Sequence, residues 1–308
     1  MKLVQRVSIK QLRSLIAVAD TGSFTLAARL LHVTQPAISM QVHELEETVG
    51  EVLLDGRRGF RLTPAGDILV RHAREVMYAL DLAEVELKAH KGVASGTVDV
   101  AAITTAEYFV PHLLAAFGRA YPEISFRLTV QNRAGMAALL RDRRVDLAIM
   151  GEPPPGLPLR RIPFARHLIS FVAAPDHPLV GRRNIAPGAL AGERLLLREQ
   201  GSGTRANLER FLRAHGVKAL RADELGSNET LKQAAMAGMG VAFLSHHTFA
   251  MELEAGRLAR LDVRDTPVER EWNVLVYADR RASLAAEALL EFLQGPGAEI
   301  MKQSGVAA

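Results

Sequence analysis

Cysteine is absent from the sequence, and its absence excludes disulfide bridges, cysteine-based zinc sites and thiol catalysis. A run of about eighteen consecutive apolar residues is also absent, so we expect no membrane-spanning helix. The N-terminal stretch is broken by charged residues and lacks a small-residue cleavage site, so it does not have the form of a secretory signal. We therefore expect a cytoplasmic protein.

What the chain does contain is typical of a soluble globular protein. Its 308 residues are enough for about two or three domains. Hydrophobic residues make up 48 % and charged residues 23 %, which allows sizeable cores. The formal net charge of +4 favours anionic partners without identifying one.

Three short amphipathic helices are predicted at the N-terminus. The first begins after Ser8, which forms a capping-box pattern with Gln11. Ser23 is placed to cap the second helix. Thr34 is placed to cap the third, where Pro36 suits the first helical turn. Two short helices joined by a tight turn are typical of a helix-turn-helix.

The third helix has an apolar stripe and an unusually neutral polar tip. The stripe has spacings of four, three and four: Ile38, Val42, Leu45 and Val49. Short polar side chains occupy the other side of the leading end, whereas the carboxylates come only at the trailing end: Gln35, Ser39, Gln41 and His43, then Glu44, Glu46 and Glu47. Base edges in a major groove match such polar groups and phosphates repel carboxylates, so the leading end is predicted to enter the groove. A plain three-helix packing unit with its tip in water would show the same pattern.

A basic hairpin is predicted at residues 52–66, VLLDGRRGFRLTPAG, with Arg57, Arg58 and Arg61 near its tip. Such a wing beside a recognition helix can grip the phosphate backbone. A solvated turn explains the glycines equally well, but it explains three clustered arginines less readily. The predicted DNA-contacting residues are Ser23, Thr25, Thr34, Gln35, Pro36, Ser39, Met40, Gln41, His43, Arg57 and Arg58.

A long helix is predicted from Pro64 to about Lys91. Apolar positions recur along it at alternating spacings of four and three, as in a heptad seam: Leu69, Ala73, Val76, Leu80, Ala83 and Leu87. The seam could pack on its own domain. Pairing with a second copy is favoured, because the two-fold symmetry of a protein dimer matches a DNA operator made of two half-sites.

The segment FTLAARLLHVTQPAISMQVHELEETVG, residues 24–50, resembles the DNA-binding signature of LysR-type transcriptional regulators. A wing, an LTPAG segment and a linker helix follow, as in that family. One departure is LLDGRRG at residues 53–59, where the family commonly has Phe, an acid and Arg after the first Leu, so either Arg57 or Arg58 could contact phosphate. Later stretches most resemble the CbbR subgroup, regulators of Calvin-cycle carbon-fixation operons: TTAEYFVPHLL, IMGEPPPGLPL, LLLREQGSGTR and LGSNETLKQAAMAGMGVAFLSHHT.

The rest of the chain alternates between predicted strands and helices, which indicates an α/β fold with mostly parallel sheets. The predicted strands are 98–103, 126–130, 145–150, 168–174, 194–197, 241–244 and 272–277, and helices are predicted at 108–120 and 135–142. One large α/β domain would fit this pattern. The resemblance implies instead a two-lobed domain like that of periplasmic solute-binding proteins.

The resemblance also implies a domain plan and a set of partners. The plan is a winged helix-turn-helix at 1–63, a dimerisation linker helix at 64–92 and an effector-binding domain at 93–308, with lobe I at 93–165 and 268–308 and lobe II at 166–267. The implied partners are double-stranded operator DNA, the chain itself as dimer or tetramer, and RNA polymerase. A small anionic metabolite such as a sugar bisphosphate, phosphoenolpyruvate or NADPH is the implied effector, with no covalent cofactor. Activation and repression are equally open.

A ligand site is expected where the strands of the α/β region end and helices begin. Free amides and hydroxyls at a glycine-rich helix start favour an anion, and arginine would add charge. Simple N-capping explains any one junction, so convergence of several on one cleft is what favours a site. The predicted effector-binding residues are Thr104, Thr105, Met150, Gly151, Arg198, Ser202, Gly203, Thr204, Arg205, Asn228 and Glu229.

Other motifs do not indicate an enzyme. GSGTR lacks the lysine of a P-loop, AGMGVA lacks the third glycine of a dinucleotide fingerprint, and no acid pair has a catalytic spacing. His246 and His247 are expected in a strand, where they would face opposite ways, so no metal site is expected. Met236 and Met239 are expected in the core, and Trp272 at the lobe boundary. A solute-binding protein is disfavoured by the N-terminal helix-turn-helix.

Overall fold

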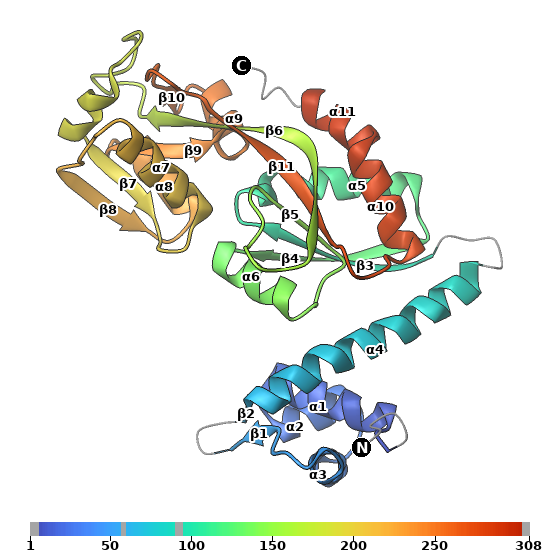
Figure 1. Ribbon diagram of the computed structural model, residues 1–308. Helices are drawn as coiled ribbons and strands as arrows, with labels where there is room; N and C mark the ends of the chain where they lie inside the picture. Colours follow the sequence, from blue (N-terminus) through green and yellow to red (C-terminus); the bar gives the residue numbers. More distant parts are fainter. Residues whose placement is uncertain (1–5, 57–59, 90–94, 304–308) are drawn as a thin grey trace. The chain divides into compact units, whose positions relative to one another are not determined.

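The computed structural model describes residues 6–56, 60–89 and 95–303, and its chain forms two compact units (Figure 1). The first contains residues 1–90, with 142–144 grouped alongside, and the second contains the remaining residues. Among the described residues, every helix is too short or too polar to cross a membrane. Each unit has its own hydrophobic core.

The first unit is a winged helix-turn-helix extended by a long helix. Its elements are α1 (Ile9–Thr21), α2 (Phe24–Leu30), α3 (Gln35–Val49), β1 (Leu54–Asp55), β2 (Arg61–Leu62) and α4 (Pro64–Ala89). Both halves of the Ser8–Gln11 capping box form, and the Ser23 hydroxyl accepts a hydrogen bond from the Leu26 N–H. The three helices enclose fully buried Leu15, Ile38 and Leu45.

The prediction that Thr34 caps α3 through its side chain is wrong. Thr34 has the extended backbone of a cap residue, but its hydroxyl makes no capping hydrogen bond. A cap side chain bonds the second or third helical N–H; Pro36 at the second position has none, and the third, that of Ala37, is not bonded by the Thr34 hydroxyl. At the start of α4 the proline comes first, and there the Gly66 N–H donates to the Thr63 hydroxyl at 3.0 Å.

Glu46 joins α3 to the hairpin. Its Oε1 accepts hydrogen bonds from the backbone N–H groups of Leu53 at 2.8 Å and Leu54 at 3.3 Å. Leu53 is fully buried, so its N–H is shielded from water. One of the acids at the trailing end of α3 therefore has a structural partner that local sequence does not reveal.

Glu46→Ala is expected to destabilise the first unit by about 1.5–3 kcal/mol, because two backbone donors lose a charged acceptor. Glu46→Gln keeps an acceptor oxygen and should lose less than half as much. Urea unfolding of the full-length protein, followed by circular dichroism, measures the difference. An alanine variant as stable as the wild type would contradict this role.

Only the first part of the α4 seam packs within its own unit. Ala73 is buried and Leu69 packs against the same core. Val76 and Leu80 are 42 % and 48 % exposed, and Ala83 is also exposed. The second part of the seam is therefore available to another partner.

The second unit is built on a mixed sheet, which confirms the α/β class. Its strands are β3 (Gly96–Ile103), β4 (Ile124–Gln131), β5 (Leu147–Met150), β6 (Leu159–Ala173), β7 (Arg194–Arg198), β8 (Arg221–Leu225), β9 (Val241–Ser245), β10 (Ala259–Arg260) and β11 (Val268–Tyr277). The order is β4-β3-β5-β11-β6-β9-β7-β8, and β10 pairs with β6. Parallel pairs lie at each end, whereas β6 and β11 run antiparallel between them.

The helices of this unit distinguish two lobes (Figure 1). They are α5 (Val110–Ala120), α6 (Arg133–Arg141), α7 (Gly203–Ala214), α8 (Asn228–Met236), α9 (His246–Glu254), α10 (Leu284–Gln294) and α11 (Pro296–Gln303), with short turns η2 (Ala106–Tyr108) and η3 (Pro187–Gly192). Lobe I contains β3 to β5 with η2, α5, α6, α10 and α11. Lobe II contains β7 to β10 with η3 and α7 to α9. The chain passes from one lobe to the other in β6 and returns in β11.

Four details of this unit differ from the sequence predictions. The strand predicted at 168–174 begins already at Leu159, and β8 was not predicted because RADEL is polar rather than apolar. His246 and His247 begin α9 instead of lying in a strand. Met239 is 47 % exposed rather than in the core, whereas Met236 is partly buried as expected.

Candidate functional site

The leading end of α3 presents an exposed polar surface. Thr34, Gln35, Pro36, Ser39, Met40 and His43 are exposed, as is Thr25 on α2, and Ser23 is half-buried at its cap. Gln41 differs, because its Oε1 accepts a hydrogen bond from the Ser14 hydroxyl at 2.5 Å. Arg57 and Arg58 lie outside the described residues.

The carboxylates of α3 are largely engaged within the unit. Glu44 accepts a hydrogen bond from Gln11 Nε2 at 3.2 Å, and Glu46 holds the hairpin as described above. Glu47 lies 3.4 Å from His43 Nε2. The polar surface at the helix start is thus free of carboxylate side chains, which suits an approach to phosphate.

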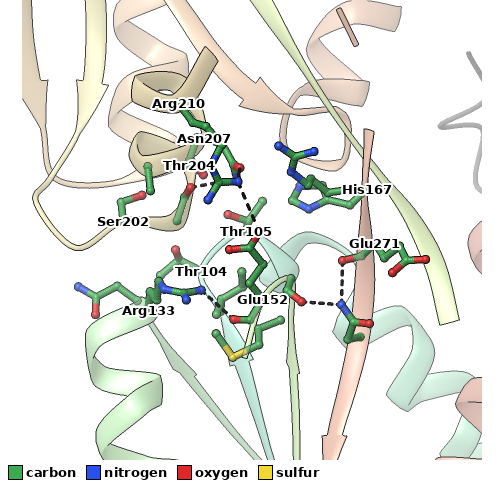
Figure 2. A pocket seen from close by; sticks show the side chains of 18 of the residues that line it. Thr104, Thr105, Arg133, Glu152, His167, Ser202, Thr204, Asn207, Arg210 and Glu271 are labelled. Carbon is green, nitrogen blue, oxygen red and sulfur yellow. Dashed lines mark hydrogen bonds and ion pairs between the residues drawn. The ribbon is translucent and has the colours of Figure 1, made fainter. Parts of the chain in front are cut away.

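The second unit contains a cavity of about 380 Å³ between its lobes. Three of the predicted junctions meet there: the carboxyl ends of β3 and β5, and the start of α7 (Figure 2). Seven predicted residues line it: Thr104, Thr105, Met150, Gly151, Ser202, Gly203 and Thr204. The junctions therefore converge as a ligand site requires.

The start of α7 brings backbone donors to this cavity. Gly201 has φ of +86°, a left-handed conformation that favours glycine and turns the chain into the helix. Ser202 is 5 % exposed, and its hydroxyl accepts from the Arg205 N–H at 3.5 Å. Gly203 and Thr204 occupy the first turn, where N–H groups have no intrahelical acceptor and attract anions.

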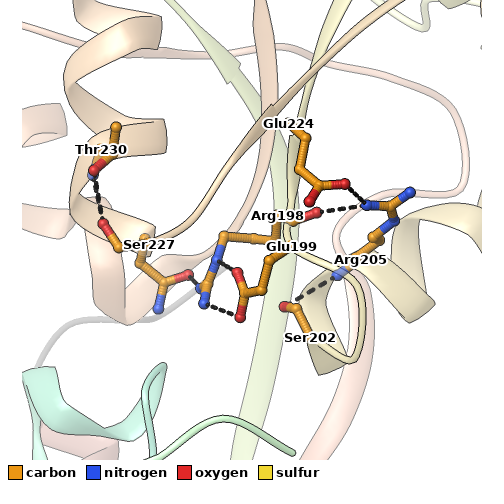
Figure 3. Close-up of polar contacts among 8 residues, drawn as sticks. Arg198, Glu199, Ser202, Arg205, Glu224, Ser227 and Thr230 are labelled. Carbon is orange, nitrogen blue, oxygen red and sulfur yellow. Dashed lines mark hydrogen bonds and ion pairs between the residues drawn. The ribbon is translucent and has the colours of Figure 1, made fainter.

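The other four predicted residues, Arg198, Arg205, Asn228 and Glu229, do not line the cavity. Figure 3 shows the contacts of the two arginines. The buried Arg198 guanidinium donates to both carboxylate oxygens of Glu199 and to Asn228 Oδ1. Arg205 pairs with Glu209 and Glu224. Acids of lobe II thus neutralise both arginines.

The fourth residue, Glu229, belongs to a charge cluster around Lys232. The Lys232 ammonium lies 2.9 Å from Glu229 and 2.7 Å from Glu252, and 5.2 Å from the centre of the Tyr108 ring. Burial lowers the pKa of Lys232, but hydrogen bonds to Glu252 and Glu229 outweigh it and the pKa is raised. Since Tyr108 is in lobe I, this cluster links the two lobes.

Four arginines line the cavity that the sequence did not predict: Arg133, Arg161, Arg210 and Arg270. Arg133 begins α6, two residues after the end of β4, so applying the strand-end rule to one more strand would have identified it. Arg161 and Arg270 lie on the antiparallel β6 and β11, to which that rule does not apply. Arg210 lies about two turns inside α7, away from the helix start.

His167 adds a neutral ring to the cavity wall. It stacks on Trp272 with ring centroids 4.0 Å apart, and its Nε2 is buried without a hydrogen-bond partner among the described residues. Burial lowers the pKa of His167 to about 3 and, secondarily, so does nearby His247. The imidazole is uncharged at neutral pH, so the positive charge of the cavity comes from arginine.

Comparisons with known proteins match both units. A family profile described as "Bacterial regulatory helix-turn-helix protein, lysR family" matches residues 9–67, and one described as "LysR substrate binding domain" matches residues 91–296. The HTH-type transcriptional regulator CfxR of Cupriavidus necator is 41 % identical, covering 97 % of this chain and 94 % of its own. CbbR of Rhodospirillum rubrum is 40 % identical, covering 93 % and 95 % respectively.

Solved structures show the same architecture. The regulatory domain of CcmR from Synechocystis PCC6803, in complex with 2-PG, has a TM-score of 0.64 and 37 % identity, covering 68 % of this chain and 99 % of its own. Full-length CbnR complexed with its target DNA has a TM-score of 0.65 and 20 % identity, covering 93 % and 99 %. At that identity CbnR supports the fold alone.

Proposed function

Because this chain belongs to the LysR family of bacterial transcriptional regulators, we propose that α3 reads operator DNA while the cavity binds a small anionic metabolite that adjusts the response. The observation that carries the second part is the convergence of the α7 start with Thr104, Thr105 and cavity-lining arginines. Backbone donors, hydroxyls and guanidinium groups together favour phosphate or carboxylate.

The proposed targets are carbon-fixation genes. Support comes from relatives named CfxR and CbbR, and from a relative of Allochromatium vinosum named RuBisCO operon transcriptional regulator, which is 38 % identical. A regulator of another metabolic operon is the alternative. Binding assays with promoter DNA from genes that neighbour this one decide between the two.

We further propose that the protein acts in the cytoplasm as a dimer or tetramer and contacts RNA polymerase when it activates. The exposed seam of Val76 and Leu80 supports pairing through α4. An effector can work only through unequal affinity for two arrangements of such an assembly. The CcmR complex supports 2-phosphoglycolate as a first probe, with sugar bisphosphates, phosphoenolpyruvate and NADPH as further ones.

Thr204→Val and Thr105→Val are expected to weaken binding of 2-phosphoglycolate about tenfold or more each, because a hydroxyl donor to a charged group contributes about 1.5–3 kcal/mol. Basal DNA binding should persist while the effector response is lost. Calorimetry measures the affinity and gel shift measures DNA binding.

Thr230→Val is the matched control, since Thr230 lies at the start of α8 and does not line the cavity. Full affinity in both cavity variants would show that the ligand binds elsewhere. Turnover of a phosphorylated probe would instead indicate an enzyme.

A further inference from the structure

Glu152 is one of three carboxylates in a cavity whose backbone donors, hydroxyls and arginines favour anions. It follows β5 in lobe I, and its Oε1 lies 3.4 Å from Nη1 of Arg210 on α7 of lobe II (Figure 2). The pair therefore spans the cavity from one lobe to the other. Any anion that binds Arg210 meets this carboxylate first.

The backbone at Glu152 is held in place, so its carboxylate is presented to Arg210 rather than free to turn away with the loop. Nη1 of Arg133 donates to the Glu152 carbonyl at 2.7 Å, and Nη2 donates to the Pro153 carbonyl at 3.4 Å. Three consecutive prolines at 153–155 restrict the chain that follows.

The other acids that line the cavity are neutralised by partners on β6. Glu269 accepts two hydrogen bonds from Arg166, at 2.6 and 2.9 Å, and Glu271 pairs with Arg161. Glu152 instead makes a single contact of 3.4 Å, although the side chains of all three pairs are similarly exposed. Such a contact is weak and exchangeable.

From this arrangement we propose that Glu152 is an internal competitor for the anionic ligand. Without ligand its carboxylate occupies Arg210, and binding requires the ligand anion to displace it. Glu152 thereby lowers the affinity of the site for anions, and most for those of higher charge. Arg210 is the residue through which it acts. This inference rests on the proposed anion-binding function of the cavity.

Calorimetry of the full-length protein with 2-phosphoglycolate tests the idea. Glu152→Gln is nearly isosteric and should bind about three- to tenfold more tightly, because a like charge a few ångströms from the ligand is removed. Arg210→Gln should bind more weakly. In the Arg210→Gln background, the fold-increase in affinity caused by Glu152→Gln should fall to less than half of its value in the wild-type background. The reason is that the guanidinium for which the carboxylate and the ligand compete is no longer present.

Glu269→Gln is the matched control, and less than a twofold change is expected because Arg166 already neutralises that acid. Unchanged or weaker binding by Glu152→Gln, with wild type binding normally, would overturn the inference alone. An equal gain in both Arg210 backgrounds would also overturn it, because it would indicate general repulsion. If neither wild type nor Glu152→Gln bound 2-phosphoglycolate or inorganic phosphate, the proposed function would fail, and the inference with it.

Discussion

Gln35→Ala and Ser39→Ala are each expected to weaken operator binding about fivefold to a hundredfold, while affinity for random duplex stays nearly unchanged. Both side chains are exposed at the leading end of α3. A well-placed pair of hydrogen bonds to a base contributes about 1–3 kcal/mol of discrimination and nothing to nonspecific binding. Competition gel shifts at modest ionic strength, with operator and random DNA, measure both affinities.

Arg61→Ala provides the contrasting control. Arg61 is exposed in β2 of the hairpin, the basic segment predicted to contact the phosphate backbone. Its loss should weaken binding to operator and random DNA alike. It should also reduce the slope of log affinity against log salt concentration by about one. A footprint that is unchanged in the Gln35 variant would overturn the assignment of α3 as the recognition helix.

Leu80→Glu is expected to dissociate the proposed dimer at protein concentrations where the wild type is fully paired. Leu80 lies in the exposed part of the α4 seam, and a glutamate would bury an uncompensated charge twice in a symmetric interface. At about 1–3 kcal/mol for each copy, the dimer should weaken by one to four orders of magnitude. Sedimentation measures the assembly, and operator affinity should fall with it.

Ala79→Glu is the matched control for this experiment. It introduces the same charge at the preceding exposed position of α4, outside the seam. Sedimentation should show wild-type assembly for this variant. A dimer that survives Leu80→Glu would mean that the seam has another partner.

Local patterns predicted the first unit well because its helices are short and their ends are marked by cap residues such as Ser8 and Ser23. Heptad spacing identified α4 but could not tell which part of the seam its own core would cover. That depends on where α4 packs against α1, a contact between distant parts of the chain. Thr34 shows the limit of cap rules, because it has the backbone conformation of a cap residue and yet makes no side-chain capping hydrogen bond.

The cavity was only half predictable for a related reason. Thr104, Gly151 and Thr204 stand at strand ends, where a general rule applies to parallel sheets. Arg161 and Arg270 reach the cavity from the antiparallel strands β6 and β11, to which the rule for parallel strands does not apply. The sequence suggested that Arg198 was available to a ligand. In the structure Glu199 neutralises its charge, and Asn228 accepts a further hydrogen bond from it. Net charge at a site depends on such pairings, which are settled only when the chain folds.

The two crossing strands limit how the lobes can move. β6 and β11 are hydrogen-bonded neighbours from Leu159 and Tyr277 to Ile169 and Val268, and they belong to one sheet that continues into both lobes. A wide separation of the lobes would break hydrogen bonds between β6 and β11. A twist of these two strands by a few degrees would keep the bonds intact. If the cavity binds a metabolite as proposed, we expect the signal to be a small twist of these two strands rather than a wide opening of the lobes.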